Sequence, residues 1–134
     1  MRIILDTNIW ISFLLGKRLS ELKLLFTEPK FEIFVSATLL DEIARVAKRR
    51  KFERHISIDA LRNLFLLIDE RCHKVSSHIE ITPIIRDRND VFILGMIKNC
   101  AAEVVVTGDK DLLVLGEFEG CKILTFTEFR EAYL

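Results

Sequence analysis

The stretch Arg2-Ile3-Ile4-Leu5-Asp6-Thr7-Asn8 opens the chain with an apolar run that ends at an acid. Three consecutive large apolar residues, without the alternation of a half-exposed strand, are typical of a β-strand buried on both faces. Strands of this kind belong to parallel sheets that helices cover on both sides. Asp6 is therefore expected where the first strand ends, at the carboxyl edge of the sheet.

The rest of the chain alternates strands with helices. Apolar runs predict further strands at 31–35, 74–75, 103–106 and 122–124. Helical periodicity and capping signals predict helices at 9–15, 20–29, 36–50, 59–71, 89–100 and 110–115, and Thr125-x-x-Glu128 is a capping box for a last helix. This alternation predicts a parallel α/β sheet with right-handed crossovers, and functional residues gather beyond the carboxyl ends of such strands.

Length and composition indicate one compact domain spanning 1–134. Half of the 134 residues are hydrophobic, and the 20 basic and 20 acidic residues cancel, so overall charge indicates neither a nucleic-acid coat nor a membrane surface. The three cysteines are far apart and form no CxxC, so we expect reduced thiols rather than disulfides or zinc ligands. Without a secretory signal or an apolar stretch of membrane-spanning length, the expected location is the cytoplasm and no membrane partner is expected.

Two acids follow buried strands. Asp6 directly follows the first strand, and Asp109 comes shortly after Val104-Val105-Val106, so both belong at the same edge of the sheet. Capping of the following helix is an alternative role for each of them, because Asp is a favoured N-cap residue.

Two further acids lie on or beside apolar helix faces. Asp90 shares a helical stripe with Ile93, Leu94 and Ile97, although a place in the first turn near the helix dipole is an alternative explanation. Glu42 borders an apolar stripe, whereas its neighbour Asp41 points away from that stripe because successive residues turn by about 100°. An ordinary boundary glutamate remains the alternative for Glu42.

Convergence of these four acids would require a cation. Carboxylates that share one place repel each other, which raises the pKa of some of them unless a divalent ion compensates. Oxygen ligands without histidine or cysteine favour Mg²⁺ or Mn²⁺ over zinc. The expected chemistry is phosphoryl transfer or phosphodiester hydrolysis.

The motifs occur in a recognisable order: Asp6-Thr7-Asn8, Leu40-Asp41-Glu42-Ile43, Asp87-x-x-Asp90 and Thr107-Gly108-Asp109-Lys110-Asp111. The chain resembles a PIN domain over nearly its whole length. More narrowly, it is similar to the VapC-like toxins of bacterial and archaeal toxin–antitoxin systems.

The resemblance implies a three-layer α/β/α fold with about five parallel strands, and an endoribonuclease that cleaves single-stranded RNA with one or two Mg²⁺ or Mn²⁺ ions. The implied partners are a cognate antitoxin and a second copy of the chain. The implied acidic site, which is both catalytic and metal-binding, contains Asp6, Glu42, Asp90 and Asp109, with Asp111 as an additional acid and Thr7, Asn8 and Thr107 as polar support. Asp6 would be the central ligand, Asp90 and Asp109 flanking ligands, and Glu42 a ligand or a group that orients water.

Binding of RNA would have to come from local positive charge. Lys48-Arg49-Arg50-Lys51 with Arg54 is a candidate for holding backbone phosphates, and Arg86 and Arg88 flank one acidic motif. A solvated helix end is the alternative for the basic run. We interpret the ten Phe residues and Trp10 as packing rather than base-stacking residues.

Three other functions match parts of the sequence. A haloacid-dehalogenase-type phosphatase needs DxD, but Asn8 stands at its second acid and Leu113 at its later acid. A phosphate-receiver domain needs paired acids after the first strand, and Asp6 is unpaired there. A non-catalytic PIN-fold module that binds RNA or acts as a scaffold is the stronger alternative.

Overall fold

The computed structural model describes residues 1–78 and 91–134, and within them six strands form one sheet in the order β3-β2-β1-β4-β6-β5. The strands are β1 (Arg2–Leu5), β2 (Glu32–Val35), β3 (His73–Lys74), β4 (Val104–Val106), β5 (Glu117–Phe118) and β6 (Cys121–Leu124). Five of them are parallel to one another, and β5 pairs antiparallel with β6 at one edge. The predicted sheet of about five parallel strands is confirmed.

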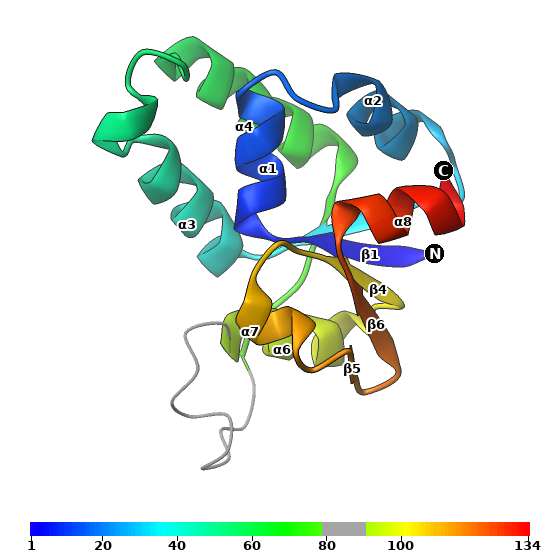
Figure 1. Cartoon of the computed structure of the whole chain (residues 1–134). Helices are drawn as coiled ribbons and strands as arrows, with labels where there is room; N and C mark the ends of the chain where they lie inside the picture. Colours follow the sequence, from blue (N-terminus) through cyan, green and yellow to red (C-terminus); the bar gives the residue numbers. More distant parts are fainter. Residues whose placement is uncertain (79–90) are drawn as a thin grey trace.

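Helices cover both faces of this sheet. The helices are α1 (Thr7–Leu14), α2 (Leu19–Thr27), α3 (Ala37–Ala47), α4 (Ile58–Arg71), α6 (Val91–Cys100), α7 (Lys110–Leu113) and α8 (Phe126–Tyr133), with a 3₁₀ turn η1 (Arg50–Phe52). Figure 1 shows α1, α4 and α8 on one side of the sheet and α6 on the other, which gives the three-layer α/β/α arrangement. Among the described residues, no helix is long and apolar enough to cross a membrane.

The core is built around β1, which has neighbouring strands on both sides. Ile3, Ile4 and Leu5 are fully buried, as expected for a central strand with helices above and below. Trp10 on α1 is also fully buried and meets the ring of Phe13 edge-on, with 5.9 Å between ring centroids. The interpretation of Trp10 as a packing residue fits this position.

The path of the chain places a crevice beside β1. After β1 the chain builds β2 and β3 on one side, and it then returns to place β4 on the other side of β1. In open α/β sheets, ligands bind at such a switch point, outside the carboxyl ends of the strands. Leu5 is in register with Val106, and the amide of Asp6 donates to the Val106 carbonyl over 2.9 Å. The residues that follow β1 and β4 are therefore neighbours.

The long helix predicted to reach about Arg50 ends earlier. In the structure α3 stops at Ala47, Lys48 is its C-cap, and the chain turns through η1. Its apolar stripe ends at Ala47, and four cations follow, so a further helical turn would have no apolar face to pack. The chain turns back instead and buries Ile56.

The edge strand β5 was not predicted. It forms because Glu119 and Gly120 both have positive φ, 51° and 78°, which is the backbone of a tight two-residue hairpin turn. The strand after this turn also begins one residue earlier than expected, at Cys121.

Candidate active site

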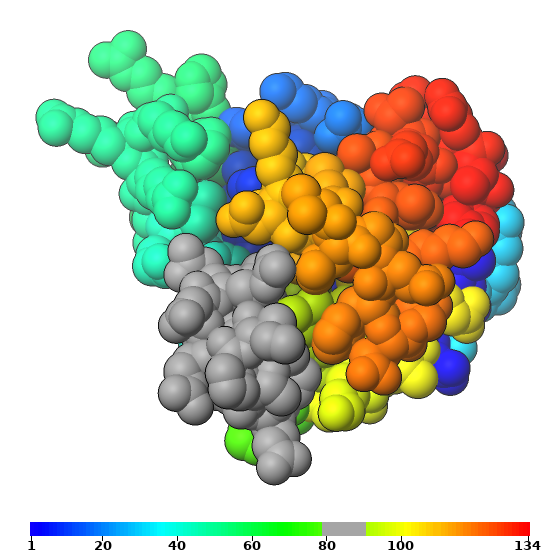
Figure 2. All heavy atoms as spheres, turned by 60° about the horizontal axis from the view of Figure 1, so that its bottom comes forward, coloured from blue at the N-terminus to red at the C-terminus, as the bar shows by residue number. Residues whose placement is uncertain are grey.

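A small hollow lies at the carboxyl edge of the sheet, beside the switch point. Its volume is about 190 Å³. Figure 2 shows the region from the side where the ends of α3 and η1 (teal to green) stand next to α7 (amber), with the dark blue N-terminal part visible between them. The residues that line the hollow are Asp6, Thr7, Asn8, Glu42, Val46, Arg49, Phe92, Ile93 and Asp109. Three of the four predicted acids are thus brought to one place.

Asp6 is the buried acid of this group, with 7% of its surface exposed. It is the N-cap of α1, and its Oδ1 accepts a hydrogen bond of 2.8 Å from the amide of Thr7. Its Oδ2 accepts a hydrogen bond of 2.7 Å from the hydroxyl of Thr107. Capping and membership of the acidic group are therefore compatible, because the same carboxylate does both.

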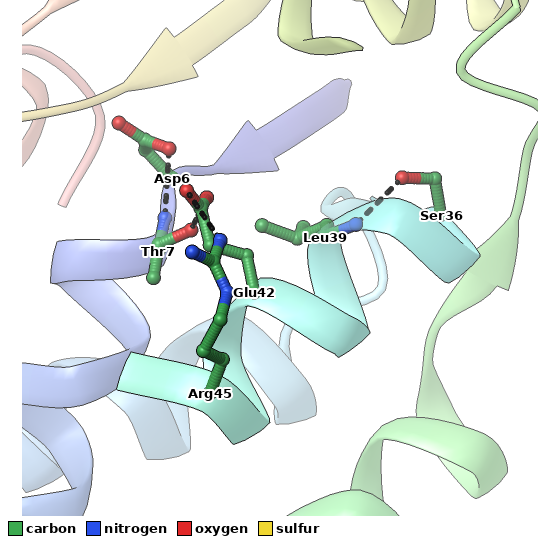
Figure 3. A network of polar contacts seen from close by, with 6 residues as sticks. All are labelled: Asp6, Thr7, Ser36, Leu39, Glu42 and Arg45. Carbon is green, nitrogen blue, oxygen red and sulfur yellow. Dashed lines mark hydrogen bonds and ion pairs between the residues drawn. The ribbon is translucent and has the colours of Figure 1, made fainter. Parts of the chain in front are cut away.

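Glu42 reaches the hollow from α3, whose N-cap is Ser36. The hydroxyl of Thr7 donates to Glu42 Oε2, and Arg45 Nη2 lies 3.6 Å from Glu42 Oε1 (Figure 3). Asp41 is exposed on the same helix and does not line the hollow. The two neighbouring acids therefore lie as the helix geometry predicts.

Asp109 follows β4 and caps the short helix α7. Its Oδ1 accepts a hydrogen bond of 2.9 Å from the amide of Asp111. Its own amide donates over 3.0 Å to the hydroxyl oxygen of Thr107, the same hydroxyl that donates to Asp6. Thr107, which is fully buried, thus connects the two strand-end acids. Asp111 is exposed two residues further on and does not line the hollow.

The charges at this edge act on one another. Burial raises the pKa of the Asp6 carboxyl above its ordinary value, hydrogen bonds from Thr107 and Thr7 lower it in part, and repulsion from the carboxylates of Glu42 and Asp109 raises it again. The net direction is upward. A nearby positive charge would relieve the cost of keeping Asp6 ionised.

The donor chemistry of the hollow fits a hard divalent cation. Its described lining offers carboxylate, hydroxyl and amide oxygens and includes no histidine or cysteine, the donor set that suits Mg²⁺ or Mn²⁺. Across residues 1–78 and 91–134, however, no three carboxylate, imidazole or thiol groups stand close enough to hold an ion as they are. The fourth predicted acid, Asp90, lies outside the described residues.

The basic run is divided between two surfaces. Arg49 lines the hollow with the acids, whereas Lys48 lines a separate groove. Arg50, Lys51 and Arg54 are exposed on and after η1. The other two predicted RNA contacts, Arg86 and Arg88, lie outside the described residues.

Sequence reasoning missed four residues at this place, of which Ile93 was predicted only as part of an apolar helix stripe. Arg45 pairs with Glu42, and Val46, Phe92 and Ile93 contribute apolar lining. The signal for Arg45 was its position three residues after Glu42, where helix geometry makes side chains neighbours. Phe92 was predicted only as a packing residue, although it closely follows the Asp87-x-x-Asp90 motif.

A larger groove of about 850 Å³ lies between α3 and α4, away from the predicted acids. Leu40, Ala44, Leu61 and Phe65 contribute to its apolar floor. Its ionisable lining includes no residue predicted for catalysis, so the smaller hollow is the candidate active site.

Comparison with known proteins agrees with this fold. The sequence model of the PIN domain matches residues 2–111. The chain belongs to the PIN domain family, a family of nucleases. No curated protein matches it in sequence.

The fold recurs among solved structures, of which two illustrate the likeness. One is VapBC2 from Rickettsia felis bound to a DNA fragment from their promoter, with a TM-score of 0.59 and 18% identity over 94% of this chain and 99% of the other. The second is the PIN domain endonuclease Utp24, with a TM-score of 0.56 and 20% identity over 92% of this chain and 84% of the other. At these identities the likeness establishes the fold.

Proposed function

We propose that this protein is a Mg²⁺- or Mn²⁺-dependent endoribonuclease that cleaves single-stranded RNA. The observation that carries the proposal is the grouping of Asp6, Glu42 and Asp109 around one hollow at the switch point of the sheet. Membership of a nuclease family supports it, and the matched range 2–111 includes all four predicted acids.

The residues have separable tasks in this proposal. Asp6, Glu42 and Asp109, together with Asp90, would hold one or two ions, with Asp111 as an additional acid. When bound, such an ion supplies a Lewis acid for the scissile phosphate and lowers the pKa of a water molecule. Thr7 and Thr107 fix the carboxylates of Glu42 and Asp6 by hydrogen bonds, and Asn8 adds an amide at the rim.

Asp6 also has an electrostatic role that is its own. Its carboxylate is buried and repelled by two other carboxylates, so its ionised form is costly before an ion arrives. Binding of a divalent cation would relieve that cost, which makes Asp6 the natural central ligand. Arg49 and the cations on and after η1 would hold phosphates that flank the scissile bond.

The test is cleavage of a labelled single-stranded RNA across titrations of Mg²⁺ and Mn²⁺. We expect cleavage that EDTA abolishes, and none by Asp6→Asn purified in the same way, which controls for contaminating ribonuclease. Intact RNA at every metal concentration, or equal cleavage by Asp6→Asn, would reject the catalytic proposal.

A PIN-fold RNA-binding or scaffold module is the second candidate. It is favoured by the spacing of the acids, because no three metal-binding groups among the described residues already stand within reach of one ion. If the protein is such a module, wild type and Asp6→Asn should bind RNA with the same affinity, and neither should cleave it.

We also propose that the protein is the toxin of a toxin–antitoxin pair, with a cognate antitoxin as its partner and pairing with a second copy of the chain. The likeness to VapBC2, a toxin–antitoxin complex, supports the antitoxin. Expression of the wild type alone should slow bacterial growth, whereas Asp6→Asn should not. Equal growth of the two strains at equal protein levels would contradict the toxin assignment, and light scattering of the purified chain tests the dimer.

A further inference from the structure

Glu42 has an occupied partner on each of its carboxylate oxygens. The Thr7 hydroxyl donates to Oε2, and the guanidinium of Arg45 lies 3.6 Å from Oε1. Figure 3 shows both contacts, with Arg45 reaching back along α3 toward the end of β1. The Arg45 side chain is 70% exposed and that of Glu42 is 28% exposed. The exposed guanidinium of Arg45 is thus paired with Glu42, an acid that lines the hollow.

The ion pair between Arg45 and Glu42 is weak enough for another cation to displace Arg45. At 3.6 Å the contact is an ion pair without hydrogen-bond geometry, and exposed pairs of this kind are weak because solvent screens them. Glu42 is held independently by Thr7, so its carboxylate keeps its place when Arg45 leaves. A divalent cation at Glu42 would repel the guanidinium by Coulomb interaction.

An Arg45 side chain released from Glu42 would be free to bind a phosphate group. Arg49, which lines the hollow, lies four residues after Arg45 in sequence, just beyond the end of α3 at Ala47. A guanidinium offers several N–H donors in a fork that matches phosphate oxygens. Arg45 and Arg49 together would present two such groups beside the acids.

We propose that Arg45 is the resident counter-ion of the acidic hollow, which neutralises Glu42 until a divalent cation takes that carboxylate and then holds a phosphate of the substrate. This inference rests on the proposed function, because it requires metal binding at Glu42. Before the ion arrives Arg45 neutralises the Glu42 carboxylate, and afterwards it contacts substrate.

The first test measures metal affinity rather than activity. Mn²⁺ binding to the full chain is followed by calorimetry for wild type, Arg45→Gln and Arg45→Lys. Removal of a positive charge several ångströms from a divalent ion should raise Mn²⁺ affinity about three- to tenfold at low salt. Arg45→Lys keeps the charge and should stay within about twofold of wild type.

The chain offers a matched control on another helix. Arg62 pairs with Asp59 at the same i,i+3 spacing and the same 3.6 Å distance, and its side chain is 68% exposed, but it lies on α4. Arg62→Gln therefore reproduces the loss of a helix-surface pair without touching the hollow. It should leave Mn²⁺ affinity unchanged, and both glutamine variants should have similar melting temperatures.

The second test addresses the substrate. With metal saturating and single-stranded RNA as the probe, Arg45→Gln should raise KM several-fold and change kcat by less than about twofold, because a contact that is equal in ground and transition states affects binding alone. Arg62→Gln should change neither constant, and Arg45→Lys should recover part of the KM loss.

The outcomes separate the two proposals. If wild type fails to bind Mn²⁺, the metal-dependent function is rejected, and the role of Arg45 with it. If wild type binds Mn²⁺ and cleaves RNA but Arg45→Gln and Arg62→Gln have equal Mn²⁺ affinities and equal KM values, the function stands and the role of Arg45 is overturned. A higher KM without a change in Mn²⁺ affinity would also overturn the exchange.

Discussion

The hydroxyl of Thr107, which follows β4, donates a hydrogen bond of 2.7 Å to Oδ2 of Asp6, which follows β1. The two residues are far apart in sequence and meet because Leu5 and Val106 are in register on neighbouring parallel strands. The same hydroxyl oxygen accepts from the amide of Asp109. One buried side chain therefore sets the position of two candidate catalytic acids.

Thr107→Val is expected to destabilise the metal-free protein. The variant keeps the shape of the side chain but leaves a buried carboxylate with one hydrogen bond fewer, a loss of about 1–3 kcal/mol at neutral pH. The loss should be smaller at pH 5 than at pH 8, because the Thr107 bond favours the ionised form of Asp6. Urea unfolding in EDTA measures this difference. Thr107→Ser retains the hydroxyl and should recover most of the stability; a valine variant as stable as wild type at pH 8 would contradict the role of the bond.

Asp6→Asn is expected to gain stability where Thr107→Val loses it. Asparagine keeps an oxygen for the Thr7 amide, and it removes one charge from a buried group that Glu42 and Asp109 repel. We expect about 0.5–2 kcal/mol of added stability at pH 7 in EDTA, and no rise in melting temperature on addition of Mn²⁺. A lower melting temperature than wild type in EDTA would mean that the cap and the Thr107 bond outweigh the repulsion.

The difference in stability between Asp6→Asn and wild type should depend on pH with a definite sign. Because the pKa of Asp6 is raised in the folded state, its contribution favours folding at low pH and is lost as pH rises through that value. The advantage of Asp6→Asn over wild type should therefore shrink as pH falls from 7 toward 5. As pH falls below the ordinary pKa of a carboxyl group, the free energy of unfolding should decrease for both proteins. The reason is that hydrogen bonds lower the pKa values of Glu21 and Glu128 in the folded state.

The sequence was sufficient to predict the strand-end acids, because the apolar runs before Asp6 and near Asp109 identify central parallel strands. Parallel strands bring their carboxyl ends to one edge. Helix geometry alone predicted that Glu42, and not its neighbour Asp41, borders the apolar face of its helix. These predictions depend on local pattern and on one general property of parallel sheets.

Other features depend on tertiary contacts that the sequence pattern does not encode. The bond from Thr107 to Asp6 requires the register between β1 and β4, which side-chain periodicity leaves open. The strand β5 is two residues long and depends on positive φ at Glu119, a residue type that rarely adopts it. The turn through η1 after α3 buries Ile56, a tertiary contact that helix propensity does not report.

RNA affinity should depend on the basic run in a salt-dependent way. Each phosphate neutralised on a single strand contributes about 0.7 to the slope of log K against log salt concentration. Arg49→Gln should lower that slope by about this amount and weaken binding, whereas Lys23→Gln, an exposed cation on α2, should do neither. Fluorescence anisotropy of a labelled oligoribonucleotide in EDTA measures both without cleavage. Equal slopes for the two variants would place the RNA elsewhere on the surface.

The adjacent acids of α3 provide a test that depends on direction alone. Glu42 lines the hollow and accepts from Thr7, whereas Asp41 is exposed on the same helix. Glu42→Gln keeps an oxygen for the Thr7 hydroxyl but removes the anionic ligand, so we expect cleavage to fall by at least about a hundredfold, as when one preorganised electrostatic group is removed. Asp41→Asn should change the free energy of unfolding by no more than about 0.5 kcal/mol and leave cleavage nearly intact. Cleavage rates at saturating Mg²⁺ and urea unfolding of both variants supply the comparison. If the two substitutions act equally, or Asp41→Asn has the larger effect, the catalytic group does not include Glu42, and the acid from α3 has to be replaced in the site.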